Sequence, residues 1–299
     1  MRRWIDVAAG PPPPRADRAA TFVYGLAQPL LGLAMLRRHP ELLRPALLPV
    51  AFVTAFCVLM ATASSDLSPA GIALRFYTAV AGAVSAPPLL FANTYARLAA
   101  LAHARLGLGP AEPRLSRFVP RLWQLFRFTL VVALTVAPVL WIVGRVPFAG
   151  AAIAFLVSAA WTLHWIVVEA LDGARVKGAP GPPPPEWPWF AAWAGWPGFA
   201  RLPGALRRPG AWAARRVHAL TSPWHEEAAL VAANPILSIG FGLAVAGLLA
   251  VPVVNLLLRP AVLVASVHLI SHMRAATATP GGAALGQSAA APRSAATST

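Results

Sequence analysis

Two pairs of polar residues near the ends of apolar runs have the types and spacing that chemistry requires. Glu169 and Asp172 are three residues apart, so their carboxyl groups could act as a general acid and base. The alternative is structural, because the same carboxylates could form the polar end of a membrane helix or pair with Arg175. We favour the structural interpretation, since the 299-residue chain holds only ten Asp and Glu residues.

His268 and His272 form the second pair. Side chains four residues apart lie on one helical face, where two imidazoles could bind a metal ion. No third ligand is near in sequence, so packed or interfacial histidines are the favoured interpretation. The chain also has no nucleophile elbow, phosphate-binding loop or zinc-protease signature. The sequence therefore predicts no enzyme, no cofactor and no metal site.

Polar residues inside apolar runs are better pointers to function, because an ionisable group inside a bilayer is costly. They are Arg75, His164, Asn255 and Arg259, and Arg44 stands at the start of a further run. Each has a structural alternative: an arginine can extend to the membrane surface, and Asn255 can satisfy backbone groups at a proline break.

The elements that must position these residues are membrane helices. The sequence is 58% hydrophobic and 12% charged, with a mean hydropathy of +0.62, whereas about a quarter of a soluble domain is charged. The net charge of +15 comes almost entirely from arginines that flank apolar runs and form no long basic block, so nucleic-acid binding is not predicted. Cys57 is the only cysteine, which excludes an intrachain disulfide.

Six apolar runs define the predicted spans. The first can cross a hydrocarbon core roughly 30 Å thick with some tilt, the second can cross as well, and the third and fourth form a tight hairpin around "GRVPFAG". The last two would be helices of about 24 and 20 Å, which is too short, and this indicates a hairpin that enters partway, with "PVVNLLLRP" at its buried tip. The runs cover residues 46–63, 76–96, 128–144, 146–168, 236–251 and 261–273.

The placement of arginine predicts the orientation. Arginines are frequent before the first run, in residues 97–127 and in residues 172–235, and absent from the turn at 64–72. Because basic connectors stay in the cytoplasm, both termini and these connectors are predicted to be cytoplasmic. The chain then forms three hairpins in a cell inner membrane.

The predicted membrane domain covers residues 21–273, between a disordered N-terminal segment at 1–20 and a disordered tail of small and polar residues at 274–299. Within it, residues 174–227 form a cytoplasmic insertion rich in Pro, Trp and Arg. Trp and Arg together favour the lipid headgroup layer, so we expect the insertion to lie on the membrane. A disordered proline-rich loop is the alternative for residues 178–186.

Three segments in order resemble the CysZ-type sulfate permease family, which shares its domain with the etoposide-induced protein 2.4 family. They are "FVYGLAQPLLGLAMLRRHPELLRPALLPV", "RVPFAGAAIAFLVSAAWTLHWIVVEALD" and "FGLAVAGLLAVPVVNLLLRPAVLVAS", the last with Pro252, Asn255 and Pro260. The resemblance implies an all-α integral membrane protein with two full spans, two partly inserted (re-entrant) hairpins and interfacial amphipathic helices. It also implies a homo-oligomer.

The resemblance further implies a sulfate site before the first span, where the family has Pro, Gly, an apolar residue, two Arg and a later Pro. The matching positions here are Pro40, Glu41, Leu42, Leu43, Arg44 and Pro49, so only the second Arg is kept. Glu41 places a negative charge where a dianion would bind, and Leu43 removes a guanidinium. This stretch is therefore predicted to be a plain helix start.

Two functional hypotheses remain. The first is a permease-like protein that moves a small solute, which the resemblance suggests is a small anion. Its candidate binding residues are Arg44, Arg38, Asn255 and Arg259. The second is a non-transporting membrane protein that organises lipids or partner proteins through the insertion. A polar path lined by Asn255, Arg259 or Arg44 would favour the first, and a fully apolar core the second.

Overall fold

Helices make up nearly all of the part of the chain that the computed structural model describes, which is residues 9–10, 12–13, 16–63, 68–83, 89–177, 201 and 203–278. Five helices are long and apolar enough to cross a membrane, as an all-α membrane protein requires: α2 (Arg18–Arg38), α3 (Pro40–Thr62), α7 (Phe118–Val143), α8 (Gly150–Gly173) and α13 (Pro252–Ala278). The others are α4 (Pro69–Ala83), α6 (Ala92–Arg105), α10 (Gly204–Thr221), α11 (His225–Ala233), α12 (Pro235–Leu249) and the 3-10 helix η2 (Ser222–Trp224). The antiparallel pair of β1 (Glu112–Pro113) and β2 (Val176–Lys177) is the only strand pairing among these residues.

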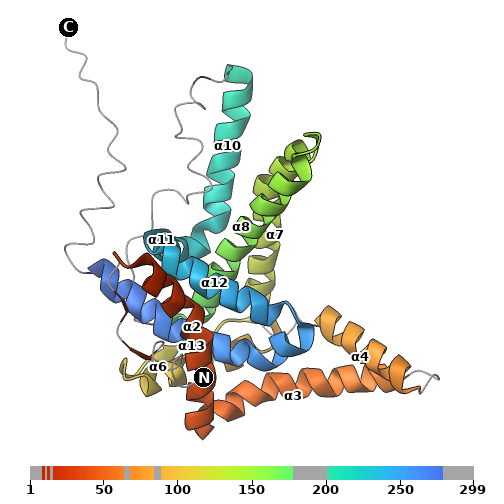
Figure 1. Cartoon of the computed structure of the whole chain (residues 1–299), viewed down its shortest axis with the longest axis vertical. Helices are drawn as coiled ribbons and strands as arrows, with labels where there is room; N and C mark the ends of the chain where they lie inside the picture. Colours follow the sequence, from red (N-terminus) through yellow and green to blue (C-terminus); the bar gives the residue numbers. More distant parts are fainter. Residues whose placement is uncertain are drawn as a thin grey trace.

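The helices form three regions (Figure 1). We call α2, α12 and α13 the central bundle, because these three helices pack along one another. Helices α3 and α4 form a first arm. Helices α7 and α8 form a second arm, with α10 against α7. The two arms leave the central bundle in different directions (Figure 1).

Helix α2 lies in the centre of the molecule although it belongs to none of the six predicted runs. The Asp17 side chain caps its start by accepting a hydrogen bond of 2.9 Å from the backbone N–H of Ala20. Arg37 and Arg38 occupy its last turn, where positive charge is favourable to the helix dipole.

Glycines let α2 approach its neighbours closely. A Cβ atom on Gly32 would lie 1.9 Å from the carbonyl oxygen of Ala261 on α13, and one on Gly25 would lie 2.4 Å from that of Leu237 on α12. Small residues at such contacts are how helices associate in lipid, where burial of apolar surface provides little drive. The central bundle is thus held by backbone proximity.

The structure corrects two predictions about the apolar runs. Helix α13 is continuous from Pro252 through Pro260, so "PVVNLLLRP" forms its first turns and is not the tip of a hairpin. The turn between α12 and α13 lies at Ala250 and Val251. The run at 76–96 is divided between α4 and α6, with residues 84–88 outside the described residues, so it is not one continuous span.

The other runs match helices. The run at 46–63 lies in α3, and the hairpin predicted from the runs at 128–144 and 146–168 is formed by α7 and α8. Helix α13 continues to Ala278, past the predicted start of the tail. Residues 178–200, which include the proline-rich part of the insertion, and residues 279–299 lie outside the described residues.

Candidate functional site

A cavity of about 420 Å³ lies between the central bundle and the second arm. It is lined by one face each of α6, α7, α8, α12 and α13 and by Trp224 of η2. Most of its wall is apolar. Its polar and charged lining residues include Arg121 and Gln124 of α7, Glu169 and Asp172 of α8, Asn255 and Arg259 of α13, and Tyr95 of α6, whose hydroxyl is buried without a hydrogen-bond partner among the described residues.

Helical periodicity explains why these side chains meet. Arg121 and Gln124 are three residues apart on α7, Glu169 and Asp172 are three apart on α8, and Asn255 and Arg259 are four apart on α13. Residues at these spacings lie on one face of a helix. Each helix therefore turns one short polar stripe toward the same space.

The two carboxylates that spacing singled out have different partners. Asp172 accepts hydrogen bonds from Arg114 Nη1 at 3.1 Å and from Gln124 Nε2 at 2.9 Å. Glu169 Oε1 lies 3.8 Å from Arg259 Nη2, which is a loose ion pair between α8 and α13. Asp172 is well satisfied, whereas the Glu169 side chain remains 67% exposed.

Arg175, which the structural interpretation offered as one way to pair these carboxylates, binds two other carboxylates instead. Its Nη2 lies 2.5 Å from Glu226 Oε2 and its Nη1 lies 3.0 Å from Glu227 Oε1, both on α11. Arg274 of α13 binds the second oxygen of Glu226. Because Arg175 directly follows α8 and Glu227 is fully buried, this cluster ties the end of α8 to α11 and α13 and belongs to the scaffold.

The amide of Asn255 uses its donor in a hydrogen bond within the protein, whereas its acceptor has no partner among the described residues. Its Nδ2 donates to the backbone oxygen of Leu249 at 3.2 Å, which satisfies a carbonyl at the end of α12 as the structural alternative predicted. Its Oδ1 is buried and has no hydrogen-bond donor among the described residues. A buried acceptor without a donor carries a free-energy cost of about 1–3 kcal/mol, and a ligand in the cavity can remove it.

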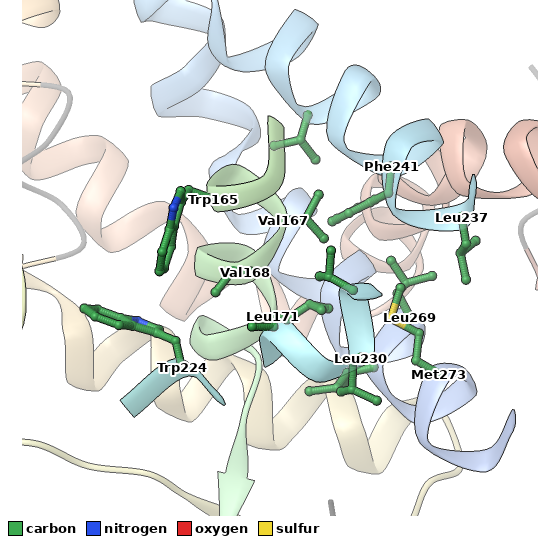
Figure 2. Close-up of a cluster of buried hydrophobic side chains, with 14 of the residues drawn as sticks. Trp165, Val167, Val168, Leu171, Trp224, Leu230, Leu237, Phe241, Leu269 and Met273 are labelled. Carbon is green, nitrogen blue, oxygen red and sulfur yellow. The ribbon is translucent and has the colours of Figure 1, made fainter. Parts of the chain in front are cut away.

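Aromatic side chains form one wall of the cavity. The ring of Trp165 on α8 packs edge to face against Trp224 and against Phe128 of α7, with ring centroids 5.5 and 5.3 Å apart. Figure 2 shows the Trp165 and Trp224 rings together, beside a buried cluster that includes Val168 and Leu171. This packing fixes the positions of the rings, so the wall is rigid.

The structure places the four predicted binding residues in two separate regions. Asn255 and Arg259 line the cavity, whereas Arg38 and Arg44 are exposed at the end of α2 and in the first turns of α3 and are not among its lining residues. Helix α3 begins at Pro40, and Glu41 in its first turn forms an ion pair of 2.7 Å with Arg105. That stretch is a helix start.

Two other polar residues of the apolar runs also lie outside the cavity lining. Arg75 donates from Nε to the carbonyl oxygen of Ala61 at 3.1 Å, which ties α4 to α3 in the first arm. His164 is buried on α8, where its ring packs edge to face against Trp165. Both serve helix packing in this structure.

The histidine pair lies in the central bundle. His268 Nδ1 is 2.9 Å from Gln28 Oε1 on α2, and His268 Nε2 is 2.9 Å from His272 Nε2. No group of three His, Cys, Asp or Glu residues that could hold a metal occurs in the described ranges. These histidines are packed and hydrogen-bonded, as the favoured interpretation expected.

Sequence reasoning missed Arg121 and Gln124 as members of the site. Both lie in "RFVPRLWQLFR", which has a charge or amide every three or four residues just before the third apolar run. That period indicates a polar stripe on a helix entering the membrane, and it was the available signal.

Comparison with known proteins identifies no relative. No family model matches the chain, and no curated protein and no solved structure matches it. The resemblance to sulfate permeases therefore stays a prediction.

Proposed function

We propose that the protein is a permease-like membrane protein, and that the cavity between the central bundle and the second arm is its solute site. The observation that supports this is a cavity among apolar helices whose wall carries polar and charged groups, including Asn255 and Arg259. Charged groups inside a membrane protein are costly and are retained mainly where they serve a solute or ion path. The cavity volume of about 420 Å³ suits a small organic or inorganic solute.

The helices around the cavity suit a bilayer. Exposed apolar side chains cover both arms, for example Phe52 and Leu59 on α3 and Trp141 and Phe155 on the second arm. Exposed apolar surface of this extent is not stable in water but is matched by lipid tails. An inner-membrane location with both termini in the cytoplasm belongs to this proposal, and reporter fusions at positions 10 and 285 that disagree would contradict it.

Uptake into proteoliposomes tests the proposal. The reconstituted chain should take up a small labelled solute, and Arg259→Gln should reduce the rate at least about tenfold, because one charge-assisted hydrogen bond corresponds to about 1.5–3 kcal/mol. Arg44→Gln is the matched control, since Arg44 is exposed and does not line the cavity. Equal rates in the two variants would contradict the assignment of this cavity as the solute path.

A second candidate function has its own observation. Helix α10 carries four arginines and no acidic residue, its exposed Trp212 ring lies 5.5 Å from the Arg216 guanidinium carbon, and Ala214 and Val217 are buried. Such a cationic, aromatic surface suits anionic headgroups and supports a lipid-organising role. Loss of anionic-vesicle binding in Arg215→Gln together with Arg216→Gln, with no uptake by the wild type, would favour this function.

A further inference from the structure

The cavity lining has both hydrogen-bond donors and hydrogen-bond acceptors that a ligand can use. Within the described residues, Glu169 contacts Arg259 through Oε1 in a loose ion pair, so its Oε2 can accept a hydrogen bond from a ligand. The buried Oδ1 of Asn255 also lacks a donor among these residues. Arg121 uses Nε to donate to Ser116 Oγ at 2.8 Å, which leaves its two terminal nitrogens. The lining thus offers acceptors from α8 and α13 and donors from α7.

The charges of the lining are balanced. The lining holds two arginines, Arg121 and Arg259, and two carboxylates, Glu169 and Asp172. A bare anion would gain from the arginines but would be placed beside the carboxylates, and a bare cation would meet the opposite problem. Like charges brought together are unfavourable, so the lining discriminates against solutes with only one sign of charge, although Glu169 is 67% exposed and Asp172 also pairs with Arg114 outside the lining.

The aromatic wall supplies the remaining recognition. Phe128, Trp165 and Trp224 present ring faces and edges to the cavity, and such surfaces bind methylene groups and also ammonium groups through the ring quadrupole. A ligand with a short apolar body between two charges matches this wall and the polar stripes at once.

We infer that the cavity binds a small zwitterion, in which an ammonium group meets Glu169, Asn255 and the aromatic wall and a phosphate or carboxylate meets Arg121. This inference rests on the proposed function, because it takes the cavity to be the solute site, and it replaces the simple anion of the permease hypothesis with a net-neutral substrate class. The zwitterion comes either from a free solute or from the headgroup of a lipid such as phosphatidylethanolamine.

Binding to the purified full-length chain in detergent tests the inference. Glycerophosphoethanolamine, inorganic phosphate and ethanolamine are titrated separately at equal ionic strength, because screening alone weakens charged ligands. Glycerophosphoethanolamine is net neutral and its ammonium group has N–H donors, so it satisfies both kinds of group and should bind at least about tenfold more tightly than either single-charge probe. Equal affinity for phosphate, or no glycerophosphoethanolamine binding by the folded chain, would overturn the inference.

Charge-neutral variants locate the binding. Glu169→Gln should weaken glycerophosphoethanolamine binding roughly tenfold while leaving phosphate binding unchanged or tighter, and Arg121→Gln should weaken the binding of both. The matched controls are Glu112→Gln on β1 and Arg208→Gln on α10, which remove the same charges from exposed positions away from the cavity. Controls that weaken glycerophosphoethanolamine binding as much as the cavity variants would place the binding outside the cavity and contradict the inference.

Two further measurements separate the sources and the two proposals. Native mass spectrometry that shows bound phosphatidylethanolamine displaced by glycerophosphoethanolamine assigns the site to a lipid headgroup, and glycerophosphoethanolamine binding without retained lipid assigns it to a free solute. Both results support zwitterion recognition. If glycerophosphoethanolamine binds but is not taken up by proteoliposomes, the transport proposal fails and the inference stands. Phosphate uptake without glycerophosphoethanolamine binding would support transport and overturn the inference.

Discussion

Helices α13 and α8 have the same mean hydropathy over their most apolar 18 residues, but 61% of those residues are buried in α13 and 28% in α8. These two helices therefore differ in their partners and not in their mean hydropathy. In α13 the partner is the backbone of α2, and along much of α8 it is the surrounding lipid in the proposed setting. Apolar content alone selects helices for the membrane, while small and polar residues decide which helices pack together.

In the described residues, more of the apolar window is buried in the central-bundle helices α2 (56%) and α13 (61%) than in the arms, where Gly150 of α8 makes one comparable approach, to the carbonyl oxygen of Val143 on α7. The bundle glycines Gly25 and Gly32 meet carbonyl oxygens of neighbouring helices, and the bundle's polar residues Gln28 and His268 bond across α2 and α13. The arms instead carry exposed Leu, Phe and Val residues. Substitutions should consequently have large effects in the bundle and small effects on the outer faces of the arms.

Gly32→Ala should have the largest effect. Its Cβ would lie 1.9 Å from the carbonyl oxygen of Ala261, which is backbone and cannot rotate away, so α2 and α13 must separate. We expect a loss of more than about 3 kcal/mol in the free energy of unfolding, measured by denaturation in detergent micelles. Gly247→Ala on α12 is the control, because no atom lies within 4 Å of that Cβ and alanine is the better helix former by about 1 kcal/mol. Similar losses in both variants would contradict the close-packed bundle.

Arg175→Gln should have the second-largest effect on the free energy of unfolding. Arg175 pairs with Glu226 and with the fully buried Glu227, and its removal takes the cation from Glu227, whereas Glu226 keeps Arg274. Breaking a fully buried ion pair costs about 3–5 kcal/mol, and because the Arg175 side chain is 24% exposed we expect about 2–3 kcal/mol. Arg114→Gln removes the same charge from an arginine that is 47% exposed and should cost less than about 1 kcal/mol. A reversed order in thermal unfolding would show that α11 does not depend on this cluster.

The comparison also shows what sequence can predict. Runs of apolar residues correctly placed α3, α7 and α8, because the length of a span is fixed by bilayer thickness. They did not place α2, whose glycines and Gln28 interrupt the apolar pattern for the sake of contacts with α12 and α13. Those contacts join residues far apart in the chain, 240 positions for Gln28 and His268, and the pattern of a single sequence does not reveal contacts at such a separation.

The cavity was predictable only in part, for a similar reason. Asn255 and Arg259 stood out because polar residues inside an apolar run need an explanation. Arg121 and Gln124 precede their run and look like ordinary interfacial residues until α7 is placed beside α8. Arg44 and Arg38 were chosen by resemblance, and they lie at the junction of α2 and α3, away from the cavity lining.

Gln28→Leu should have a moderate effect, because it removes the hydrogen bond of 2.9 Å between Gln28 Oε1 and His268 Nδ1 inside the bundle. The buried imidazole nitrogen of His268 then lacks this partner, and we expect the free energy of unfolding to fall by about 1–2 kcal/mol. His268→Phe and the double variant complete a cycle that isolates the pair. A coupling energy near zero would mean that the two side chains are held by packing alone.

The smallest effects are expected on the outer face of the first arm, where two valines of α3 provide a matched test. Val53 is buried against α4 in a cluster with Cys57 and Val80, whereas Val58 is 47% exposed on the same helix. Val53→Ala should lower the free energy of unfolding by about 1 kcal/mol through lost contacts. Val58→Ala should not change it measurably, since lipid or detergent replaces the methyl groups and alanine favours the helix. Unfolding in detergent at several protein concentrations measures both. If Val58→Ala costs as much as Val53→Ala, and the cost depends on protein concentration, the exposed face of α3 is covered by a second copy of the chain rather than by lipid, because only a contact between copies is weakened by dilution.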